Sequence, residues 1–144
     1  WYWSWLEYRV VIATFSLEGA REKLNRAVEI IADEVKEDSN FTYVNEVALN
    51  RIIVNESSKS FLTKAVDQEN KAGNFKSYKS LIQRLVTLIQ ETNPDYPYAK
   101  SLSSTLVEAS LHQHFLGDHF KSITDCQSKG PADFLADLVK KTLS

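Results

Sequence analysis

Three histidines lie close together, and imidazole is the side chain that most often moves protons and binds metals near neutral pH. His112, His114 and His119 fall within a single short segment of the chain. If that segment is helical, Glu108, His112 and His119 point in directions that differ by no more than about 40°. These three residues form a polar stripe, whereas His114 points elsewhere. The polar stripe is therefore the candidate metal site.

Two chemistries fit the polar stripe. A carboxylate with a histidine four residues later can share a divalent metal ion or act as an acid/base pair. However, the spacing of Glu108, His112 and His119 matches no HExxH motif. We therefore favour an interpretation without a cofactor, in which these side chains line a groove between helices or are satisfied by hydrogen bonds.

Other catalytic and binding motifs are missing from the sequence. It has no Gly-x-Ser-x-Gly motif, and its four glycines do not form a phosphate-binding loop. Cys126 is the only cysteine, so the chain has neither an internal disulfide nor a cysteine zinc site. The net charge is −2 and there is no basic run, which argues against nucleic acid as a partner.

The three tryptophans, Trp1, Trp3 and Trp5, all lie at the start of the chain. In the interpretation we favour, Trp5 packs into the core with Leu6 and Tyr8, and only residues 1–3 fray. Alternatively, the tryptophans anchor the chain at a membrane interface, where Trp and Tyr are enriched. In a third interpretation, they bind a protein partner or a second copy of this chain.

Apolar residues recur at steps of three and four through most of the sequence, which is typical of amphipathic helices. The strongest patterns span 17–35, 75–89, 98–116 and the segment after Pro131, and weaker ones span 4–15, 41–54 and 59–68. We predict an all-α fold in which residues 1–144 form one domain, a helical bundle of five to six helices.

The segment 8–15 has an alternative structure. Its β-branched and aromatic residues also suit a buried strand, which would make the fold α+β. Such a strand needs a partner, and only 41–54 could supply one. Ser4 and Glu7 fit a capping box that would start a helix instead. We therefore favour helix for both segments.

Local signals predict where several helices begin and end. Ser16 is expected to cap the helix over 17–35, and Gly117 to end the helix over 98–116. Pro131 is expected at the first position of the last helix. Because the helix over 98–116 is apolar on two opposite sides, we expect it to lie at the centre of the bundle.

These patterns favour a non-enzymatic interaction or regulatory module that binds a protein partner or itself. One alternative is a metal-dependent or acid/base enzyme that uses Glu108, His112 and His119. Another is a domain that adjoins a membrane anchor through Trp1, Trp3 and Trp5. The sequence contains no apolar stretch of the roughly 20 residues that span a bilayer and no signal peptide, so we expect a cytoplasmic location.

Overall fold

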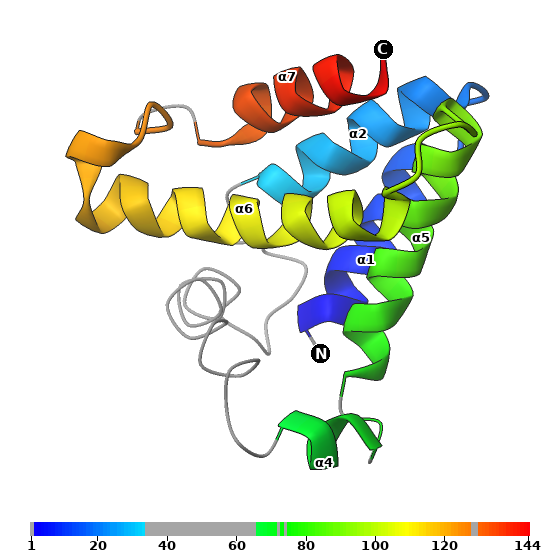
Figure 1. The fold of residues 1–144 in the computed structure, drawn as a ribbon, viewed down its shortest axis with the longest axis horizontal. Helices are drawn as coiled ribbons and strands as arrows, with labels where there is room; N and C mark the ends of the chain where they lie inside the picture. Colours follow the sequence, from blue (N-terminus) through cyan, green and yellow to red (C-terminus); the bar gives the residue numbers. More distant parts are fainter. Residues whose placement is uncertain (1, 34–65, 72, 74, 128–129) are drawn as a thin grey trace.

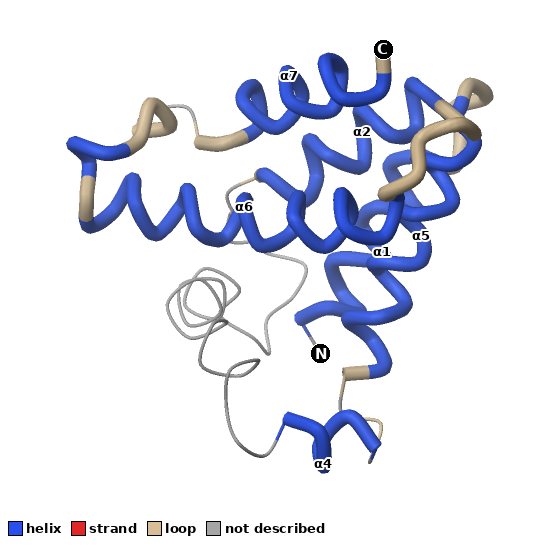
Figure 2. The backbone as a smooth tube through the Cα atoms, viewed as in Figure 1, coloured by secondary structure: helices blue, strands red, loops and turns tan. Residues whose placement is uncertain are grey.

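A computed structural model describes residues 2–33, 66–71, 73, 75–127 and 130–144. Every regular element in these ranges is helical, and none is a strand (Figure 2). The elements are α1 (Tyr2–Thr14), α2 (Ala20–Ala32), α4 (Val66–Lys71), α5 (Lys76–Thr92), α6 (Ala99–His119), the 3₁₀ turn η1 (Lys121–Ile123) and α7 (Ala132–Leu143).

Five helices, α1, α2, α5, α6 and α7, pack together, so the predicted all-α bundle is confirmed. Helix α1 covers residues 8–14, which rules out the alternative strand there. The segment 41–54 and most of 59–68 lie outside the described residues. Helix α4 lies beyond the start of α5 (Figure 1).

The chain turns back on itself between α1 and α2 and between α6 and α7 (Figure 1). Helices α1 and α5 run side by side in the same direction, and α2 runs against α1. Helix α6 crosses in front of this group, and α7 returns along α6 in the opposite direction. The end of α7 is tied to the end of α5, because the Asn93 side-chain amide donates a hydrogen bond of 3.2 Å to the Leu143 carbonyl.

Helix α2 is central, because it packs against α1, α5, α6 and α7. Its last turn is covered on several sides, and its buried residues are Leu24, Ala27, Val28, Ile30, Ile31 and Ala32. The prediction that the 98–116 helix is central is therefore wrong. Helix α6 is buried on two sides, as its sequence indicates, but it shares them among α5, α2 and α7 at the edge of the bundle.

Several predicted boundaries are wrong for identifiable reasons. Helix α2 begins at Ala20, after Gly19 in an extended conformation, so Ser16 is not its cap. Helix α6 continues through Gly117 to His119. The following loop lies close to the helix at Gly117, where a Cβ would be 3.4 Å from the carbonyl oxygen of Cys126, an ordinary contact distance.

Other boundaries are confirmed. Helix α5 ends at Thr92, before Pro94, as the restriction on residues preceding proline predicts. Pro131 directly precedes α7, one position earlier than predicted. The acidic first turn and basic last turn of α7 complement its dipole.

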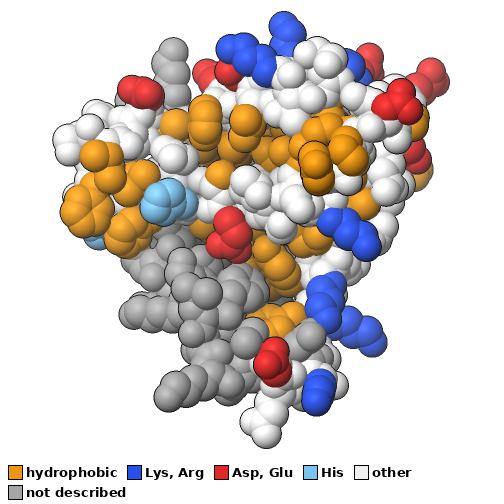
Figure 3. All heavy atoms as spheres, viewed as in Figure 1, with side chains coloured by type: hydrophobic (Ala, Val, Ile, Leu, Met, Phe, Trp, Pro, Cys, Tyr) orange, Lys and Arg blue, Asp and Glu red, His pale blue; other side chains and the backbone are white. Residues whose placement is uncertain are grey.

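Among the described helices, none is both long and apolar enough to cross a bilayer. Acidic and basic side chains are interspersed on the face shown in Figure 3.

The central position of α2 yields a stability prediction. Leu24 is fully buried in the core, so we expect Leu24→Ala to lower the free energy of unfolding by about 2–5 kcal/mol. The neighbouring Asn25 is exposed, and Asn25→Ala should change stability by less than about 0.5 kcal/mol. Urea denaturation of both variants measures the difference, and equal effects would contradict the central packing of α2.

Candidate functional site

The three residues of the polar stripe lie in different environments. Tyr78 on α5 donates a hydrogen bond of 3.3 Å to Glu108. His112 is exposed. His119 packs against Phe115, with ring centroids 4.7 Å apart. In the part of the chain that the structure describes, no three His, Cys, Asp or Glu side chains are arranged to hold a metal ion. The described residues therefore provide no site with three ligands for the predicted metal ion.

The histidine outside the stripe has a specific structural partner. His114 Nε2 lies 2.9 Å from the carbonyl oxygen of Ala32, and Ser110 Oγ donates to the carbonyl of Ile31 at 3.0 Å. The last four carbonyls of a helix have no partner within it. Ser110 and His114 lie four residues apart on α6, so one face of α6 caps the end of α2.

This capping predicts different roles for two neighbouring histidines. His114→Ala leaves the Ala32 carbonyl without its donor, so we expect a loss of about 1–3 kcal/mol in unfolding free energy. His112→Ala should change stability by less than about 0.5 kcal/mol, because His112 is exposed. Thermal and urea unfolding, with and without zinc, measure both effects. A zinc-dependent stabilisation that His112→Ala removes would instead support the metal hypothesis.

Glu108 and Tyr78 form a partly buried pair between α5 and α6. Burial raises the pKa of Glu108, and the hydrogen bond from Tyr78 partly opposes that shift. Burial also raises the pKa of Tyr78, and the charge and hydrogen bond of Glu108 add to the effect. The Trp3 ring packs edge-on against Tyr78, with ring centroids 4.8 Å apart. With Trp3, the pair therefore joins α1, α5 and α6 at a partly buried position.

The raised pKa of Glu108 predicts the direction in which stability changes with pH. Its ordinary value is 4.5, so above this pH the folded chain holds the proton more tightly than the unfolded chain. The free energy of unfolding therefore falls as the pH rises from 4.5 through the raised pKa. Glu108→Gln removes this titration and keeps an acceptor for Tyr78. We expect the variant to lose less stability than the wild type across this window.

Urea unfolding of both proteins over a pH series from about 4 to 8 measures the difference. The other carboxyl groups titrate in both proteins, so their contributions cancel in the comparison. Parallel stability curves would contradict the raised pKa of Glu108.

The aromatic residues at the start of the chain mostly support the fold. Tyr2 is buried, and Trp3 and Trp5 pack partly buried against the core. The Arg9 guanidinium lies over the Trp5 ring at 5.1 Å, a cation–π contact. Trp1 lies outside the described residues. The prediction that residues 1–3 fray is therefore wrong for Tyr2, which is buried in α1, and for Trp3, which contacts Tyr78.

The opposite side of α1 carries an exposed apolar surface. Tyr8 is 60% exposed, Ile12 60% and Phe15, which directly follows the helix, 86%. We call these three residues the outer face of α1. The prediction that Tyr8 packs into the core is wrong, because Tyr2, Leu6 and Val10 occupy the core side of this helix. A helix that is apolar on both sides gives no sequence signal for which side is buried.

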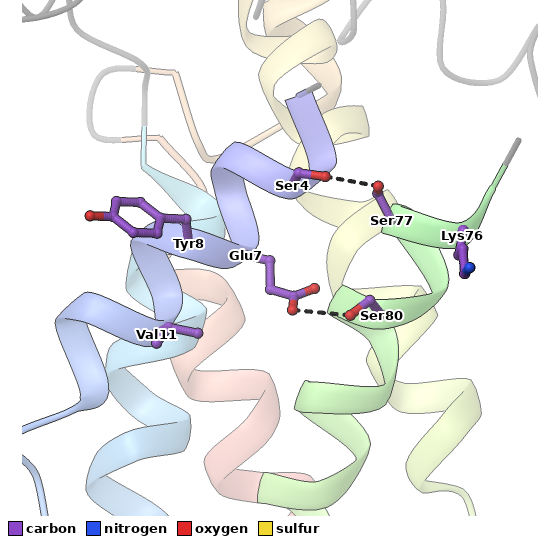
Figure 4. Close-up of a pocket in the computed structure, with 7 residues that line it drawn as sticks. All are labelled: Ser4, Glu7, Tyr8, Val11, Lys76, Ser77 and Ser80. Carbon is purple, nitrogen blue, oxygen red and sulfur yellow. Dashed lines mark hydrogen bonds between the residues drawn. The ribbon is translucent and has the colours of Figure 1, made fainter.

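A groove of about 440 Å³ lies between α1 and α5, next to the outer face (Figure 4). Its lining residues are Ser4, Glu7, Tyr8, Val11, Lys76, Ser77 and Ser80. Figure 4 shows Tyr8 pointing away from α5, whereas Ser4 and Glu7 point toward it.

The serine and glutamate side chains of this groove are hydrogen-bonded between the two helices. Ser4 Oγ donates to Ser77 Oγ at 2.8 Å, and Ser80 Oγ donates to Glu7 at 3.0 Å. Arg84 pairs with the same Glu7 oxygen at 3.2 Å. The capping-box prediction is wrong, because Ser4 lies inside α1 and its hydroxyl bonds α5. These bonds hold α1 against α5.

Comparison with models of known protein families, with curated proteins and with solved structures found no match. The functional argument therefore rests on the surfaces of this chain.

Proposed function

We propose that this protein is a non-enzymatic interaction module that binds a helix of a partner protein through the outer face of α1. The observation that carries the proposal is the exposure of three large apolar side chains, Tyr8, Ile12 and Phe15. Contiguous exposed apolar side chains of this kind mark interaction sites. Aromatic residues are also the commonest anchors of binding energy in such sites.

The spacing of the outer face indicates a helical partner. From the partly buried Trp5, the exposed residues follow at steps of three, four and three, which is the spacing of a coiled-coil seam. A straight partner helix laid along α1 would contact each of these side chains in turn.

The surroundings of the outer face suit binding. Its helix is held rigid by its opposite side, where Leu6 and Val10 are buried, so little order is lost when a partner binds. The groove beside it supplies a polar rim with Lys76 and Glu7. This arrangement supports binding more than catalysis, because the side chains of Ser4, Glu7 and Ser80 are already hydrogen-bonded.

Substitution of the outer face tests the proposal. A displayed library of amphipathic helical peptides is selected on the wild-type chain, and the binders are titrated against Ile12→Glu/Phe15→Glu. We expect this variant to weaken binding by about 30-fold or more, because it places charges in a buried contact. Asn25→Glu, which adds a charge to the exposed side of α2, is the matched control and should bind normally.

Circular dichroism and urea unfolding establish that the variant is folded, as expected for side chains that already face solvent. Two outcomes oppose the proposal. One is a selection that yields no binder dependent on Ile12 and Phe15. The other is that the wild-type chain binds lipid vesicles but no peptide, and that the variant no longer binds the vesicles. This result would favour a membrane surface as the partner. Sedimentation velocity shows whether a second copy is the partner.

A further inference from the structure

A second exposed apolar surface lies at the far end of α6, away from α1. Phe120, Ile123 and Phe134 are all exposed there. Figure 3 shows hydrophobic side chains gathered at the left of the molecule, over the end of α6 and η1. A cavity of about 600 Å³ opens beside them, lined by Gln113, Ile123, Thr124, Asp125, Cys126, Gly130, Asp133 and Phe134.

The walls of this cavity are fixed by hydrogen bonds. Thr124 Oγ1 donates to Gln113 at 2.6 Å and accepts from the Cys126 backbone N–H at 3.0 Å. The Gln127 side-chain amide donates to the carbonyl of Thr124 at 3.2 Å. Gly130 adopts a left-handed conformation with φ of 70°, which favours glycine. The concavity is therefore formed before any ligand arrives, as in most binding sites.

The charged side chains among the described residues that line this cavity are both acidic, Asp125 and Asp133. Both are exposed, and neither forms an ion pair with another described residue. Two exposed carboxylates beside apolar side chains complement a ligand that combines an apolar group with positive charge.

We propose that this cavity binds a basic amphipathic segment of a protein partner. An apolar side chain of the segment contacts Ile123 and Phe134, and its Lys or Arg residues lie against Asp125 and Asp133. This site is separate from the outer face of α1, so the two proposals stand or fall independently.

The lone cysteine provides a direct reporter of occupancy. Cys126 lines the cavity and is the only cysteine of the chain, so a thiol reagent modifies this one position. The probe is a short helical peptide with leucines on one face and lysines on the other. A matched peptide carries glutamate in place of lysine. We expect the basic peptide to slow modification of Cys126 in a saturable way, and the acidic peptide to leave the rate unchanged.

Substitutions separate the charge from the apolar contact. Asp125→Asn and Asp133→Asn should each weaken the basic peptide by up to about fivefold, because exposed ion pairs are modest. Ile123→Ser should weaken it further. Asp95→Asn, in the loop between α5 and α6, is the matched control and should have no effect.

Three outcomes would overturn the assignment. The first is equal protection by the acidic and basic peptides, and the second is no protection by either. The third is loss of protection in the outer-face variant Ile12→Glu/Phe15→Glu, which would place the peptide on α1. Circular dichroism of each variant confirms that it is folded before its binding is compared.

Discussion

Burial of α2 is the constraint on which the rest of the structure depends. A helix that contacts four others needs apolar residues on several sides, and it also needs partners for its last carbonyls. Ser110 and His114 of α6 supply those partners at the carbonyls of Ile31 and Ala32. The position of α6 is thus fixed by hydrogen bonds as well as by packing, and α7 then closes over α2.

Helix α1 shows how a second constraint leads to a surface. Its core side packs against α2 and α5; Ser4 donates a hydrogen bond to Ser77 of α5 and Glu7 accepts one from Ser80, and these contacts fix the rotation of α1 about its own axis. With the rotation fixed, Tyr8, Ile12 and Phe15 remain largely exposed. The exposed outer face is therefore a consequence of the polar contacts on the adjoining side of the same helix.

The end of α6 follows the same logic on a smaller scale. The loop that contains Cys126 lies close to the helix at Gly117. Thr124 then bridges Gln113 and the loop backbone, which leaves a formed cavity between α6 and α7. Two ends of the bundle thus present apolar side chains, one beside hydrogen-bonded polar groups and the other beside exposed carboxylates.

The sequence by itself determined the helical class and most helix positions, because apolar spacing and proline restrictions act locally. Only the tertiary structure decided what each face meets. In it, α2 lies at the centre and Tyr8 and His112 are exposed to solvent. Ser4 and Glu7 form hydrogen bonds with α5. These outcomes depend on contacts between residues far apart in the chain. The local sequence of a helix that is apolar on both sides does not indicate which side forms those contacts.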